Sequence, residues 1–141
     1  FADKSYCYWP SNENATWQSD LHATIQPNAN RFVGKPYVLI DGGCFSTAGH
    51  VCSIIKEQQL GILVGEEAGS TYTCNDSSIH GSFKHTSLTY RIPRVTFKTC
   101  ATSFPKNRGV LPDVEVLETL NDVIEQLDPV IEYVLEQIRL N

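Results

Sequence analysis

One serine of this sequence stands where a short apolar run gives way to a helical pattern. Residues 37–40 (Tyr-Val-Leu-Ile) are followed by Asp-Gly-Gly-Cys-Phe and then by Ser46. At such a junction the hydroxyl lies above the sheet edge, and the first N–H groups of the helix point outward. These groups and the helix dipole stabilise an oxyanion beside the hydroxyl. The residues therefore permit attack on a carbonyl by Ser46, with backbone donation to the oxyanion from Thr47 and Gly43.

The same position has a second interpretation that involves no chemistry. Serine is one of the best N-cap residues, so the role of Ser46 could be purely structural, with its side chain accepting a hydrogen bond from a backbone N–H of its own helix. In an α/β arrangement, however, ligands bind at the carboxyl ends of the strands, where this serine falls. The residues by themselves leave both interpretations open.

A serine hydroxyl needs a general base to become a good nucleophile. His50 lies one helical turn after Ser46 and is a candidate base, and the other interpretation is a partly buried structural histidine. His85 and His80 fall in a strand-rich region that could fold back over the site. His22 is expected at the surface.

The sequence contains an odd number of cysteines without close CxxC spacing, namely Cys7, Cys44, Cys52, Cys74 and Cys100. At least one thiol is therefore free or bonded to another chain, and a zinc cage is disfavoured. Cys44 could itself be a nucleophile, but no adjacent basic residue would form its thiolate, so burial as a small apolar side chain is the other interpretation. We expect no metal and no other cofactor.

The segments around Ser46 predict a strand, a helix and a second strand. Residues 35–41 predict a central strand buried on both faces. Apolar residues at helical spacing predict a helix that ends at Gly61, and its buried stripe is Ala48, Val51, Cys52 and Ile55. Residues 62–64 predict the next strand. Such a unit has parallel strands and a right-handed crossover.

The flanking residues predict less regular structure. Residues 1–34 predict an irregular lead-in with one short helix near residues 17–23. A loop is expected at residues 69–78, followed by strands near residues 82–90 and 95–99. Residues 108–116 then predict a loop that runs into a short strand.

Two helices are predicted at the end of the chain. Thr119 and Asp122 have the spacing of a capping box, and Asp128 with Pro129 would open the second helix. The predicted buried stripe of this second helix consists of Ile131, Val134, Leu135 and Ile138.

Length and charge exclude several classes of function. The chain of 141 residues, 41% hydrophobic, suffices for one compact domain. A net charge of −5 argues against a nucleic-acid partner, and no apolar run is long enough to span a membrane. Residues 79–108 carry six basic residues and no carboxylate, which is either a binding face for acidic groups or a set of solvent-facing positions.

Three segments resemble the C-terminal-processing (tail-specific) serine proteases, a family that includes the tricorn core protease and the retinoid-binding repeats of the interphotoreceptor protein. Residues 43–48 resemble the nucleophile segment, residues 63–69 the strand and glycine loop after it, and residues 108–116 the Gly-Val-x-Pro-Asp segment. The resemblance extends over residues 36–140. It implies an α/β, ClpP/crotonase-like fold of stacked ββα units, often in an extracytoplasmic (periplasmic or secreted) protein.

The resemblance also implies a reaction and a substrate. The reaction is hydrolysis of peptide bonds in unstructured or C-terminal segments, through an acyl-enzyme on Ser46. The family's lysine base is missing from residues 66–72, and Lys106 occupies the position of a glutamate that orients a histidine base in tricorn-like members. The family's upstream oxyanion segment is also missing.

These departures lead to an expectation about the chain. We expect a single domain, residues 1–141, that is the C-terminal part of a catalytic domain and that on its own is inactive or needs the remainder as a partner. The chain begins at Phe1 and contains no methionine, so we expect either a product matured by cleavage or a piece of a longer one. Two alternatives stay open. One is an inactive relative that binds peptides or apolar ligands in the same groove, and the other is a crotonase-type acyl-CoA enzyme.

Overall fold

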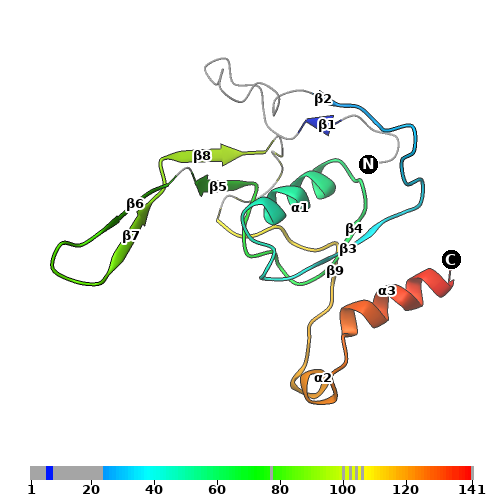
Figure 1. The fold of residues 1–141 in the computed structure, drawn as a ribbon. Helices are drawn as coiled ribbons and strands as arrows, with labels where there is room; N and C mark the ends of the chain where they lie inside the picture. The colour runs from blue at the N-terminus through cyan, green and yellow to red at the C-terminus, as the bar shows by residue number, and fades with distance from the viewer. Residues whose placement is uncertain are drawn as a thin grey trace.

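The fold is built on a three-stranded parallel sheet with strand order β3-β4-β9 (Figure 1). In this computed structural model the described residues are 6–7, 24–76, 78–99, 101, 103, 105 and 107–140. The strands of the sheet are β3 (Tyr37–Ile40), β4 (Ile62–Gly65) and β9 (Val114–Glu115). The helix α1 (Thr47–Glu57) connects β3 to β4, which confirms the predicted strand-helix-strand unit with parallel strands.

The central strand of the sheet is β4 and not β3. Leu63 and Val64 of β4 are completely buried, because strands flank them on both sides. Among the described strands, β3 lies at the sheet edge, and Leu39 is 47% exposed. The prediction that residues 35–41 form a central strand buried on both faces is therefore wrong.

The buried face of α1 also differs from the predicted stripe. Cys52 and Ile55 are buried as expected, but Ala48 and Val51 are exposed. Their places are taken by a set of small and polar residues together with one isoleucine, namely Gly49, His50, Ser53 and Ile54. The helix ends at Glu57 and not at Gly61, because Gln59 adopts a φ of 52° that a helix cannot continue.

The hydrophobic core lies between α1, the sheet and the loop segments that follow β4. Its buried members are Ile40, Cys52, Ile54, Ile55, Leu60, Leu63, Ala68 and Val110, with Val38 and Cys44 packed against them. The buried hydroxyl of Ser53 donates to the carbonyl oxygen of His50 at 2.7 Å and lies 3.0 Å from Thr99 Oγ1. These hydrogen bonds offset the free-energy cost of burying the Ser53 hydroxyl in the core.

Two antiparallel pairs extend from this centre. β5 (Thr73–Asp76) pairs with β8 (Val95–Lys98), and β6 (Ile79–Ser82) forms a hairpin with β7 (Thr89–Ile92) that projects away from α1 (Figure 1). The predicted strand at residues 95–99 is confirmed. The predicted loop at residues 69–78 contains β5, and the predicted strand at residues 82–90 is mostly the hairpin turn. The Phe83 N–H closes this turn on the Leu88 carbonyl oxygen at 3.1 Å.

The lead-in segment contributes a short antiparallel pair, β1 (Tyr6–Cys7) with β2 (Thr24–Ile25). The helix predicted near residues 17–23, His22, and the side chains of Cys7 and Cys100 lie outside the described residues. So does Lys106.

Both predicted C-terminal helices are present. α2 (Leu120–Glu125) begins with the predicted capping box of Thr119 and Asp122. α3 (Pro129–Leu140) begins after Asp128, whose carboxylate accepts from the N–H groups of Val130 at 3.0 Å and Ile131 at 2.9 Å.

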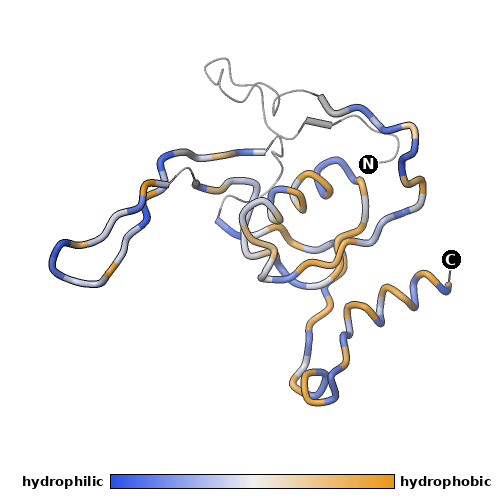
Figure 2. Tube along the Cα trace, viewed as in Figure 1, coloured by the Kyte–Doolittle hydropathy of each residue, from blue (hydrophilic) through white to orange (hydrophobic). Residues whose placement is uncertain are grey.

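The apolar stripe of α3 is not buried as predicted. Val134 is 7% exposed, whereas Ile131, Leu135 and Ile138 are 44%, 39% and 56% exposed. Figure 2 shows that hydrophobic residues recur along this part of the chain, where α3 extends beyond the small sheet. None of the helices in the described ranges is long and apolar enough to cross a membrane.

Candidate functional site

Ser46 stands directly before α1 in an unusual backbone conformation. Its φ is 55° and its ψ is −120°, and its side chain makes no capping hydrogen bond. Ser46 occupies the second position of a turn that the Ala48 N–H closes on the Phe45 carbonyl oxygen at 3.2 Å. Glycine is the usual residue at such a φ, and another residue there costs about 1–3 kcal/mol. In this structure Ser46 therefore does not serve as a capping side chain, and its hydroxyl is kept in a strained turn.

The turn that leads to Ser46 is held by its own hydrogen bonds. The Asp41 carboxylate accepts from the Gly43 N–H at 2.8 Å, and the Asp41 carbonyl oxygen accepts from the Cys44 N–H at 3.0 Å. Because the Gly43 amide already donates to Asp41, we do not retain Gly43 as an oxyanion donor. Its place is in the turn. Thr47 is the first residue of α1, so its role as an oxyanion donor stays a prediction.

The candidate bases lie on two different elements of the fold. His50 is 1% exposed on the buried face of α1, and its Nδ1 lies 4.0 Å from Cys74 Sγ on β5. Burial lowers the pKa of His50, which keeps its imidazole neutral. His80 and His85 are exposed on the β6–β7 hairpin, and this hairpin extends away from α1 (Figure 1).

Sequence reasoning missed Ser70, which lies in the loop after β4. Its hydroxyl donates to the Ser46 carbonyl oxygen at 3.5 Å. A Cβ atom at position 49 would collide with this hydroxyl, so the close approach requires Gly49. Glycine inside a helix costs about 1 kcal/mol relative to alanine. Gly49 within the predicted helix was therefore the signal that another segment packs closely there.

Glu67 fixes the same loop to the chain that follows Arg108. Its carboxylate accepts from Arg108 Nε at 3.2 Å, from Arg108 Nη2 at 2.6 Å and from the Gly109 N–H at 2.6 Å. The Arg108 guanidinium lowers the pKa of Glu67. One cation of the basic segment 79–108 thus has a structural partner, although both side chains of the pair are solvent-exposed.

The aspartate of the Gly-Val-x-Pro-Asp segment is also structural. Asp113 Oδ2 accepts from the Leu63 N–H at 2.9 Å, and Oδ1 accepts from Lys56 Nζ at 2.8 Å. Lys56 Nζ also donates to the carbonyl oxygen of Leu111 at 2.9 Å. Asp113 therefore connects β4 and α1 to the segment that enters β9.

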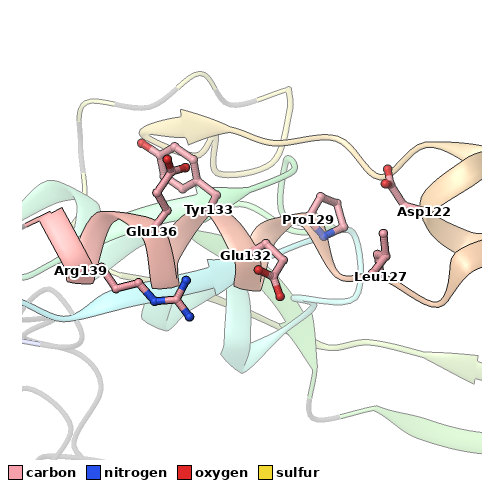
Figure 3. A pocket seen from close by; sticks show the side chains of 7 residues that line it. All are labelled: Asp122, Leu127, Pro129, Glu132, Tyr133, Glu136 and Arg139. Carbon is pink, nitrogen blue, oxygen red and sulfur yellow. The ribbon is translucent and has the colours of Figure 1, made fainter.

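A cavity of about 340 Å³ opens at the carboxyl ends of β3 and β4, next to the turn before Ser46. Four carboxylates line it together with backbone and apolar groups, namely Asp41, Glu66, Glu118 and Asp128. A second hollow of about 560 Å³ follows α3 and is lined by residues that include Tyr133, Glu136 and Arg139 (Figure 3). The described lining residues of neither hollow include Ser46. Among the described residues, no group of three or more His, Cys, Asp or Glu side chains could hold a metal ion.

Three described cysteines lie on or beside α1. Cys44 precedes the helix, Cys52 lies within it, and Cys74 lies on β5 with its Sγ 4.0 Å from His50 Nδ1. Burial, and then the neighbouring Cys44, raise the pKa of Cys52 to about 12. Cys44 is half-buried and packs against the hydrophobic core. This packing favours the apolar interpretation of Cys44 over the nucleophilic one.

Solved structures of proteases share this fold. The tricorn protease aligns with a TM-score of 0.51 and 21% identity over 74% of this chain. Mature CPAF aligns with a TM-score of 0.57 and 19% identity over 78% of the chain. A candidate peptidase from Parabacteroides merdae ATCC 43184 aligns with a TM-score of 0.57 and 14% identity over 82% of the chain.

The chain corresponds to only part of each of these proteins. It covers 10% of the tricorn protease chain, 20% of the CPAF chain and 35% of the Parabacteroides protein. No curated protein matches the chain significantly. The model of peptidase family S41, in contrast, matches residues 6–116, which is most of the sequence. This chain, with Ser46 at the start of its first long helix, therefore belongs to peptidase family S41.

Proposed function

We propose that this chain carries the nucleophile of a serine peptidase, and that the nucleophile is Ser46. The observation that supports this most is the Ser46 backbone, whose φ of 55° keeps a non-capping serine in a strained turn at a helix start. Strained backbone in a sparsely populated conformation is characteristic of active sites. Membership of a peptidase family is the second support.

The proposed reaction proceeds through an acyl-enzyme. Ser46 Oγ attacks the carbonyl carbon of the scissile peptide bond, and the oxyanion that forms lies at the start of α1 within reach of the Thr47 N–H. A general base takes the hydroxyl proton and passes it to the leaving amine. Water then attacks the acyl carbon and releases Ser46. The substrates are peptides and unfolded segments of proteins, including C-terminal ones.

We propose that the remainder of the catalytic domain supplies the base and a second oxyanion donor. His50 is buried against Cys74, and the exposed histidines lie on a projecting hairpin. The apolar residues Ile131, Leu135 and Ile138 on α3 offer a surface for this remainder. In the same account, the remainder completes a ClpP/crotonase-like arrangement of ββα units of which this chain contributes one.

The family resemblance further leads us to propose an extracytoplasmic location, in the periplasm or outside the cell. Fractionation of the natural source, with detection of the protein by antibody, tests this. Recovery with cytosolic markers alone would contradict it.

The experiment that tests the function compares peptide cleavage by the complete gene product and by its Ser46→Ala variant. We expect cleavage of an unstructured peptide by the wild type and a loss of at least about 1,000-fold in the variant. A matched Ser87→Ala variant, which changes an exposed serine of the β6–β7 hairpin, should cleave normally. Peptide binding without cleavage by the wild type would instead indicate an inactive relative that uses the same groove.

A further inference from the structure

The loop after β4 makes two close approaches to the segment around Ser46. A Cβ atom at position 49 would collide with Ser70 Oγ and would lie 2.9 Å from the Ser70 carbonyl oxygen. A Cβ atom at position 69 would collide with the carbonyl oxygen of Gly42. Both contacts exist only because glycine stands at positions 49 and 69. The loop therefore packs against the turn before Ser46 and against the first turn of α1.

The other side of this loop is held by the segment after Arg108. The Ala68 N–H donates to the Val110 carbonyl oxygen at 2.9 Å, and the Val110 N–H donates to the Ser70 carbonyl oxygen at 3.4 Å. Val110 is completely buried, so this support belongs to the core. Ser70 thus stands on a fixed backbone, with its hydroxyl directed at the Ser46 carbonyl oxygen.

We propose that Ser70 is a positioning residue for Ser46, acting through the hydrogen bond of its hydroxyl to the Ser46 carbonyl oxygen and through its packing on Gly49. This inference rests on the proposed function of Ser46. A strained turn persists only where the surrounding structure holds it. The carbonyl oxygen of Ser46 also accepts the first helical hydrogen bond, from the His50 N–H at 3.1 Å. Ser70 therefore contacts the peptide group that joins the strained turn to the helix.

The test measures how fast a fluorophosphonate modifies Ser46 in the complete gene product. Saturation kinetics separate the maximal rate constant of inactivation from the dissociation constant of the reagent. We expect Ser70→Ala to lower the maximal rate constant about tenfold or more, because even a small displacement of a nucleophile strongly lowers the reaction rate. The dissociation constant and the melting temperature should stay close to the wild-type values. Ser87→Ala, an exposed serine of the hairpin turn, is the matched control.

A double-mutant cycle tests the contact with Gly49. Gly49→Ala should lower the melting temperature more in the wild-type background than in the Ser70→Ala background, because the collision with the hydroxyl disappears in the latter. Equal effects in both backgrounds would contradict the packing part of the proposal.

The outcomes separate the two proposals. A wild-type protein that the reagent does not modify at Ser46 would refute the proposed function, and this inference with it. A modified wild type together with an unchanged maximal rate constant in Ser70→Ala would refute the inference alone. A fall in rate that only follows a loss of folded protein would also refute it, since that would be a structural role.

Discussion

The carboxylate of Asp113 accepts a hydrogen bond from the backbone N–H of Leu63 at 2.9 Å. The reciprocal bond, from the Asp113 N–H to the Leu63 carbonyl oxygen, is 2.8 Å long. Leu63 is completely buried in the central strand of the sheet, directly after the helix that Ser46 opens. Asp113 thus makes part of the sheet's hydrogen-bonding pattern with its side chain, which gives this aspartate a structural role.

Replacing this aspartate should destabilise the fold. Asp113→Ala leaves the Leu63 N–H without its acceptor and removes the ion pair with Lys56. We expect a loss of about 2 kcal/mol in the free energy of unfolding, chiefly from the part-buried N–H, because exposed ion pairs contribute little. Chemical denaturation measures the effect. Glu125→Ala, at an exposed position of α2, should change stability little, and equal stability of the two variants would contradict this role for Asp113.

The backbone conformation at Ser46 predicts different stabilities for the glycine and alanine variants. Ser46→Gly should be more stable than Ser46→Ala by about 1 kcal/mol, because glycine adopts a φ of 55° without a clash between Cβ and the backbone. Both variants lack the hydroxyl, so neither should be modified by a fluorophosphonate at this position. Melting temperatures compare the pair directly. A Ser46→Ala variant as stable as Ser46→Gly would mean that the turn carries no strain.

His50 predicts a dependence of stability on pH. Burial lowers its pKa in the folded state from the usual 6.5, so the unfolded state binds a proton more readily than the folded state does. The contribution of His50 to the free energy of unfolding is fully present above pH 6.5 and is lost as the pH falls below that value. We expect His50→Gln to lose less stability than the wild type between pH 7 and pH 5. His80→Gln, which changes an exposed histidine of β6, is the matched control. Identical pH dependence of wild type and His50→Gln would contradict this prediction.

The apolar face of α3 predicts a difference between the chain alone and the complete gene product. Ile138 is 56% exposed here, so Ile138→Glu should change the stability of the 141-residue chain by less than about 0.5 kcal/mol. In the complete product the same charge would fall in a contact, and both stability and peptidase activity should decrease. Asn121→Glu adds the same charge at an exposed position of α2 and is the control. Equal behaviour of both variants in the complete product would show that the remainder does not cover α3.

The sequence was most informative where local signals decide the structure. The apolar runs of β3 and β4, the glycine turn between β3 and α1, and the capping box of Thr119 with Asp122 all follow from neighbouring residues, and these elements were predicted. The position of Ser46 at the start of a helix belongs to the same class.

The errors concern contacts between distant segments. Whether β3 or β4 is central depends on where β9 pairs, some 50 residues after β4 in the sequence. The face of α1 that is buried includes Gly49, which Ser70 from the loop after β4 approaches closely, whereas Val51 is exposed. The hydrogen bond of the Gly43 N–H depends on the side-chain rotamer of Asp41, which cannot be predicted from the spacing of residues in the sequence. Burial of the apolar residues of α3 depends on whether another part of the protein packs against this helix where it extends beyond the sheet.

The most direct test of the account is to locate a fluorophosphonate adduct by peptide mapping and mass spectrometry of the complete gene product. The account predicts a single stoichiometric adduct on Ser46, which disappears after denaturation before labelling and in Ser46→Ala. An adduct on another serine, or none at all in a preparation that cleaves peptides, would contradict the claim that Ser46 is the nucleophile.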